Sequence, residues 1–145
     1  MKIRRSVLDA IAAHARRDAP HECCGLLIGD SGEVLEAVPA RNVAEDPLRR
    51  YEVSAEDHFA VIRRCRDEYV ASGLSRKTDA IGVYHSHPHS APVPSPTDLE
   101  LAFTDFLFVI AGPVDTGAAP DIRAYRVKDG AFEEIGLEPV PDLDV

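Results

Sequence analysis

Two histidines that lie one residue apart, directly after an apolar run, constrain this chain more than any other feature. Residues 80–84 are Ala-Ile-Gly-Val-Tyr, and His85-Ser86-His87-Pro88 follows them. A short apolar run of this kind predicts a buried strand. Residues i and i+2 of a strand point to the same side, so His85 and His87 should direct their imidazoles to one place. Pro88 cannot donate a hydrogen bond to a neighbouring strand and should end this one.

A carboxylate follows this histidine pair. Two imidazoles and Asp98 would make a three-ligand zinc set with a fourth position open to water, which is typical of catalytic sites. Residues 95–98, Ser-Pro-Thr-Asp, also form a good helix start. Ser95 would be the cap, Pro96 would take the first helical position, and Asp98 would complete a capping box. On this segment alone capping is the commoner role. The predicted apolar face of the helix is Leu99, Leu101, Ala102 and Phe103.

A possible general base lies far upstream. Glu22 stands just before residues 24–29, an apolar run that predicts a core strand. A side chain at a strand entrance can lean into a cleft and exchange a proton there. The simpler interpretation is a surface carboxylate. Cys23 and Cys24 are expected to be small buried side chains.

Together these residues resemble the signature of the JAMM, or MPN-plus, metalloprotease family. That signature is an upstream Glu, then His-Ser/Thr-His-Pro, seven residues counted from the second His, and Ser-x-x-Asp. Here residues 88–94 are the seven, and Ser95-x-x-Asp98 follows. The resemblance covers nearly the whole chain and is closest to small bacterial members that carry Pro-x-Glu-x-Cys-Gly-Leu-Leu-x-Gly. It implies a cytidine-deaminase-like sandwich, with a curved mixed sheet between helices.

The resemblance also implies an activity. His85, His87 and Asp98 would hold one Zn²⁺ per chain, Glu22 would be the general base, and Ser95 would donate a hydrogen bond to the developing oxyanion. The reaction would be hydrolysis of an amide bond at the C-terminal glycine of a ubiquitin-like protein. The expected partner is a bacterial sulfur carrier, from which cysteine or a conjugated group is released. Formation of a homodimer is left as a possibility. The alternative function is a non-catalytic MPN scaffold or binding module.

Periodicity alone predicts a mixed α/β sheet with about three helices. The first helix is expected over residues 6–17 and the second over about 55–71, with Ser54 as its cap and Phe59, Ile62, Cys65 and Tyr69 on its inner face. The other expected strands are 33–44, 51–53, 106–110, 122–127 and the edge strand 131–135. We expect one domain over residues 1–136 and a loose tail over residues 137–145.

Composition excludes several classes of protein. The chain has 145 residues and a net charge of −9, which suits one domain and disfavours general nucleic-acid binding. No apolar stretch approaches the length of a membrane span, and residues 1–15 lack the continuous apolar region of a signal peptide. Three cysteines without a C-x-x-C pair predict reduced thiols and a cytoplasmic location.

Overall fold

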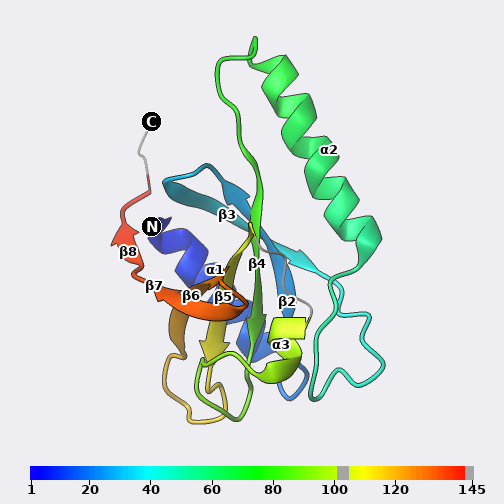
Figure 1. Ribbon diagram of the computed structural model, residues 1–145, viewed down its shortest axis with the longest axis vertical. Coiled ribbons are helices and arrows are strands. Elements are labelled where there is room, and N and C mark those ends of the chain that lie inside the picture. The colour runs from blue at the N-terminus through cyan, green and yellow to red at the C-terminus, as the bar shows by residue number, and fades with distance from the viewer. Residues whose placement is uncertain (101–104, 143–145) are drawn as a thin grey trace.

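Eight strands form one mixed sheet in the computed structural model, which describes residues 1–100 and 105–142, with residues 99 and 100 described by their backbone only. The strand order is β7-β6-β5-β4-β2-β3-β1-β8 (Figure 1). The elements in chain order are β1 Lys2–Arg4, α1 Arg5–Asp18, β2 Cys24–Gly29, β3 Glu33–Ala40, α2 Ala55–Ala71, β4 Asp79–Ser86, α3 Pro96–Glu100, β5 Leu107–Gly112, β6 Asp121–Lys128, β7 Ala131–Ile135 and β8 Glu138–Val140.

Helices cover both faces of this sheet, because its central strands are apolar on both sides. Every residue of β2 and of β5 is buried. Leu27 and Val109 belong to a core cluster with residues of α1, whereas Leu26 and Ile110 belong to a second cluster with residues of α2. Strands buried on both faces need such continuous apolar runs. The sheet is therefore the middle layer between α1 and α2.

Strand β4 lies inside the sheet, antiparallel to β2 and parallel to β5. Val83 packs in the α2-side cluster and Tyr84 in the α1-side cluster. Alternation then places His85 on the α2 side and Ser86 on the α1 side. At the end of β4, His85 therefore lies on the α2 side of a strand that is paired along both edges.

The predicted fold class is confirmed. The structure is a mixed α/β sheet with three helices among the described residues. The first two helices and strands β2, β4, β5, β6 and β7 lie close to the predicted ranges. Ser54 caps α2, as expected, by accepting a hydrogen bond from the backbone N of Asp57 at 3.3 Å.

Several local predictions are wrong. Glu138–Val140 forms β8 and pairs with β1, so these residues of the expected loose tail belong to the sheet. Strand β1 was not predicted at all, since three residues are too few for periodicity to detect. The predicted strand 51–53 is reduced to a single bridge between Asn42 and Val53.

The inner face of α2 agrees only in part with the prediction. Cys65 is buried and Tyr69 is half-buried, as expected. Phe59 and Ile62, however, are exposed, at 60% and 44%, and Val61 is buried instead. Apolar residues lie on several sides of α2, so the pattern left the orientation of its apolar face ambiguous. The predicted apolar face of the third helix, Leu99, Leu101, Ala102 and Phe103, lies outside the side chains that the structure describes.

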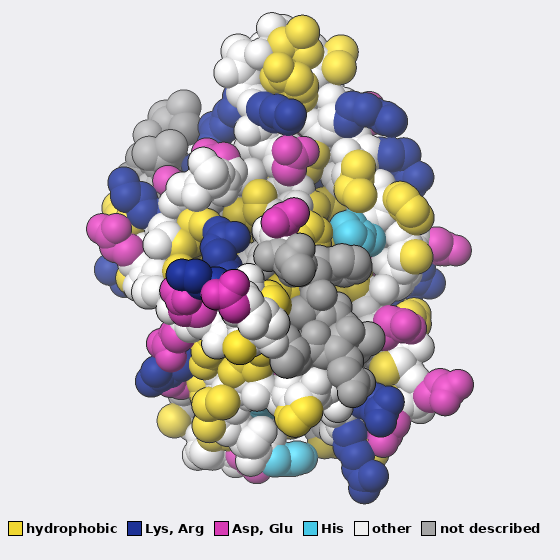
Figure 2. Space-filling model, viewed as in Figure 1, with side chains coloured by type: hydrophobic (Ala, Val, Ile, Leu, Met, Phe, Trp, Pro, Cys, Tyr) yellow, Lys and Arg dark blue, Asp and Glu magenta, His cyan; other side chains and the backbone are white. Residues whose placement is uncertain are grey.

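Charged side chains of both signs cover the molecular face drawn in Figure 2, and Lys and Arg gather with apolar side chains near its upper end. In the described part of the chain, no helix is long and apolar enough to cross a membrane.

Candidate metal centre

The two histidines of the sequence motif meet at the end of β4. Their Nε2 atoms are 3.3 Å apart, and both side chains are buried. The backbone N of His87 donates to the carbonyl of Ala111 at 2.8 Å, which continues the pairing of β4 with β5 past Ser86. Gly112 permits this approach, because a Cβ on it would lie 2.6 Å from the carbonyl oxygen of His87. The pair is therefore held by the sheet rather than by a free loop.

Asp98 lies against both imidazoles. Its Oδ1 is 3.3 Å from His85 Nε2, and its Oδ2 is 3.4 Å from His87 Nε2. Ligand atoms on a tetrahedral zinc, with bonds of about 2.0–2.1 Å, are separated by about 3.3–3.4 Å. The three side chains thus have the spacing and the chemistry of a zinc ligand set.

The helix cap and the carboxylate contact coexist at α3. Asp98 Oδ2 accepts from the backbone N of Ser95 at 2.8 Å, and Ser95 Oγ accepts from the backbone N of Asp98 at 3.1 Å. This is the reciprocal arrangement of a capping box, with Asp in place of Glu. The box fixes the Asp98 side chain while its oxygens face the histidines. Ser95 Oγ is an acceptor here, which leaves its hydrogen available for donation.

Glu22 completes a buried group with the histidines. Ligand atoms of Glu22, His85 and His87 all lie within 4.8 Å of one another. The Glu22 side chain is 6% exposed, and its buried Oε1 has no hydrogen-bond partner among the described residues. A buried, unpartnered carboxylate oxygen costs stability unless a ligand or water satisfies it. The sequence alternative of a surface carboxylate is therefore wrong.

Burial and hydrogen bonding set the charges of the group. Burial raises the pKa of Glu22 to about 7, although His87 opposes this. Burial lowers the pKa of His85 and outweighs the effect of Asp98. Burial also opposes charge on His87, but hydrogen bonds to Asp98 and the Ala91 carbonyl prevail and raise its pKa. Burial opposes the charge on Asp98 too, yet the histidines hold its pKa well below the ordinary range. An anionic carboxylate facing two imidazoles suits a cation.

The two imidazole rings are oriented in different ways. His87 Nδ1 lies 2.9 Å from the carbonyl oxygen of Ala91, which favours a hydrogen on Nδ1 and leaves Nε2 free to act as a ligand. His85 Nδ1 is buried and has no hydrogen-bond partner among the described residues. Instead, the ring of Tyr51 stacks on His85, with centroids 4.1 Å apart and planes inclined by 15°. Sequence reasoning placed Tyr51 in the expected strand 51–53 and gave it no role in the site.

Other residues near the motif have structural roles. Ser86 points away from the site and accepts a hydrogen bond from the backbone N of Cys23 at 2.9 Å. Cys23 and Cys24 are buried free thiols, as predicted. His89 is exposed and pairs with Asp115 at 2.8 Å, so it stays outside the group.

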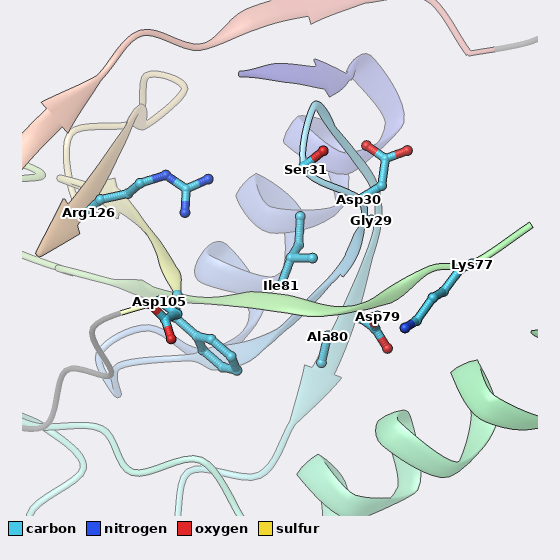
Figure 3. Close-up of a pocket in the computed structure, with 10 residues that line it drawn as sticks. Gly29, Asp30, Ser31, Lys77, Asp79, Ala80, Ile81, Asp105 and Arg126 are labelled. Carbon is cyan, nitrogen blue, oxygen red and sulfur yellow. The ribbon is translucent and has the colours of Figure 1, made fainter.

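A large surface cavity lies elsewhere. It has a volume of about 550 Å³, and it is lined by residues at the start of β4 and the end of β2, with Lys77 and Arg126 on opposite sides (Figure 3). Because the histidines lie at the other end of β4, this cavity is separate from the candidate metal centre.

Comparison with known proteins agrees with this geometry. Residues 4–128 match the family described as prokaryotic homologs of the JAB domain. The chain belongs to this family. A CysO-cysteine peptidase of Mycobacterium bovis is 33% identical over 95% of this chain and 88% of its own length. A desampylase of Haloferax volcanii is 39% identical over 72% of this chain and 75% of its own length.

Solved structures place the chain in the same fold. A JAB1/MPN domain protein of Archaeoglobus fulgidus superposes with a TM-score of 0.61 at 26% identity, covering 97% of this chain and 99% of the other. The predicted family is thereby confirmed, and the chain is a JAMM-type metalloprotease. The buried group of Glu22, His85 and His87 is consistent with the zinc site of such a protein.

Proposed function

We propose that the chain is a zinc-dependent peptidase that hydrolyses an amide bond at the C-terminal glycine of a ubiquitin-like protein. In this proposal His85, His87 and Asp98 hold one zinc per chain, Glu22 is the general base, and Ser95 stabilises the oxyanion. The observation that supports it most is the ligand triangle with separations of 3.3–3.4 Å beside the unpartnered oxygen of Glu22.

When bound, the zinc would lower the pKa of a water molecule to about 7 and polarise the scissile carbonyl. Glu22 Oε1 would accept the proton of the attacking water and later transfer it to the leaving amine. In the metal-free chain burial raises the pKa of Glu22, and the same burial favours proton transfer from water to this carboxylate. Ser95 Oγ would donate its hydrogen to the developing oxyanion, an interaction worth about 10²-fold in rate or more.

The substrate class comes from the relatives. The matched proteins are named a CysO-cysteine peptidase and a desampylase, and the family resemblance described above links the small bacterial members to ubiquitin-like sulfur carriers. We therefore propose a sulfur carrier as the partner, with cysteine or a conjugated group as the product. The complete set of ligand side chains argues against the alternative of a non-catalytic scaffold.

The test uses the zinc-reconstituted chain and two substrates made from one sulfur carrier: the carrier with cysteine on its C-terminal glycine, and the carrier joined to a lysine side chain. We expect cleavage after the glycine, detected by intact mass. Glu22→Gln should abolish it while zinc stays bound, and His89→Ala should match the parent. Full activity of Glu22→Gln would refute the proposed mechanism. Zinc binding without cleavage of either substrate would refute the proposed substrate class.

A further inference from the structure

One amide side chain fastens the loop between β3 and α2, which Figure 1 shows in cyan beside the end of the molecule that carries α3. Asn42 Nδ2 donates to the carbonyl oxygens of Glu22 at 3.0 Å and of Arg50 at 2.9 Å. Asn42 Oδ1 accepts from the backbone N of Ala44 and of Glu52, each at 3.0 Å. An amide offers two donors and accepts at two lone pairs, so its full capacity is used on the backbone.

These four bonds join two parts of the candidate site. One of them ends on the main chain of Glu22, the proposed base. Two others end on Arg50 and Glu52, the residues on either side of Tyr51. In a fifth contact, the backbone N of Glu22 donates to the carbonyl of Pro47 at 2.8 Å. This bond holds the loop between β3 and α2 against the residues that precede β2. Asn42 therefore sets where Glu22 and Tyr51 lie relative to each other.

Tyr51 in turn sets the plane of a metal ligand. A metal-binding histidine usually donates its second ring nitrogen to a carboxylate, carbonyl or water, and this bond fixes the ring. None of the described residues pairs with His85 Nδ1, whereas His87 Nδ1 has a partner in Ala91. The Tyr51 ring, 5% exposed, lies nearly parallel to His85 at 4.1 Å. This packing restricts rotation of the imidazole about the bond that would swing Nε2 away from Asp98.

We propose that Tyr51 and Asn42 are positioning residues. Tyr51 orients the ligand His85 by stacking on its ring, and Asn42 holds Tyr51 and Glu22 in fixed positions relative to each other. This inference rests on the proposed function only in treating His85 as a ligand and Glu22 as the base. Neither positioning residue belongs to the proposed ligand set or is the proposed base. Both act through the residues that fill these roles.

The experiment compares zinc affinity, measured by competition with a chelator, and the visible absorption spectrum of the cobalt-substituted chain. Removing an orienting contact from a ligand typically weakens metal binding 10–100-fold. We expect Tyr51→Leu to weaken zinc binding at least tenfold and to change the cobalt spectrum, because the ring plane is lost. Tyr51→Phe keeps the ring and should restore both to the parent values.

Asn42 is tested with two variants. Asn42→Ala should weaken zinc binding as Tyr51→Leu does and should also lower kcat, since Glu22 loses its fixed position. Asn42→Asp keeps an oxygen for Ala44 and Glu52 but sets a carboxylate oxygen against the carbonyl oxygens of Glu22 and Arg50, so in its folded form it should weaken zinc binding at least as much as Asn42→Ala. If both residues act in one chain of contacts, the losses in zinc affinity for Asn42→Ala and Tyr51→Leu should not add.

Two controls separate positioning from general loss of stability. Asp30→Ala removes two side-chain bonds to the backbone, from Gly32 and Glu33, in the turn between β2 and β3. Phe132→Leu removes a packed ring on β7. Both should lower resistance to urea yet leave zinc affinity and the cobalt spectrum unchanged. Parent-like zinc affinity and spectrum in folded Tyr51→Leu, or equal changes in the controls, would overturn the inference.

These readouts also keep the two proposals apart. If the parent chain binds zinc but cleaves no carrier conjugate, the proposed substrate class fails. The affinities and spectra still decide the roles of Tyr51 and Asn42.

Discussion

Replacing Glu22 by Gln should make the metal-free protein more stable while removing its activity. The carboxylate is 6% exposed and one of its oxygens has no hydrogen-bond partner among the described residues. Folding therefore removes a charge from water without full compensation. A neutral amide of nearly the same shape avoids that cost, although it sacrifices the proposed base.

The raised pKa gives the size of the effect. Burial raises the pKa of Glu22 from 4.5 to about 7, which corresponds to at most about 3–4 kcal/mol at roughly 1.4 kcal/mol for each unit of pKa. Relaxation of the protein and penetration of water generally reduce such a burial cost. We expect Glu22→Gln to gain about 1–2 kcal/mol at pH 8, a rise in Tm of about 3–6 °C for a domain of this size.

The gain should depend on pH in a defined direction. Below pH 4.5 the carboxyl is protonated in both the folded and the unfolded chain, so the substitution changes little. Between pH 4.5 and about 7 the unfolded chain loses its proton first, and the parent loses stability relative to the variant. Above about pH 7 the difference should be constant.

The assay is urea unfolding of chelator-treated parent and variant, followed by circular dichroism at pH 4.5 and pH 8. Glu45→Gln, which changes an exposed carboxylate on the neighbouring loop, is the matched control and should show no such difference. A Glu22→Gln protein that is less stable than the parent at pH 8, or equally more stable at both pH values, would refute this reasoning.

Three further predictions concern the motif. Asp98→Ala should lose zinc, and metal mass spectrometry that still finds one zinc per chain would contradict its role as a ligand. Ser95→Ala should lower stability by about 1 kcal/mol through loss of the cap and kcat by about 10²-fold. By contrast, Ser54→Ala, which removes the cap of α2, should show the stability loss alone in parallel urea and kinetic measurements. His89→Ala should change neither zinc content nor kcat, because His89 is exposed and pairs with Asp115; a loss of zinc there would show that the ligand set is incomplete.

The sequence predicted the positions of the motif residues better than their surroundings. Alternation along β4 was enough to place His85 and His87 together, and the capping signal at Ser95 placed Asp98 in the first turn of a helix. Both rest on short-range geometry that one strand or one helical turn determines. Tyr51 and Asn42 could not be found in this way, since their contacts join a loop to strands β2 and β4 and leave no local pattern.

The errors in the fold have the same origin. Strands β1 and β8 are three residues each, and they form because β1 pairs with β3 on one side and with β8 on the other. The exposed Phe59 and buried Val61 of α2 likewise depend on which side of the helix the sheet approaches. Long-range packing decides such features, and the periodicity within one element contains no information about that packing.

The capping box at α3 means that some motif residues are favoured for folding and others only for activity. Ser95 and Asp98 satisfy each other's backbone, so a descendant that no longer cleaved anything would still be favoured to keep them for folding. Glu22 is the opposite case, because burying its carboxylate lowers the stability of the fold and only its proposed role as the base would favour keeping it. During divergence of such chains, loss of activity should therefore be recorded first at Glu22, while Ser-x-x-Asp persists as a relic of the working enzyme.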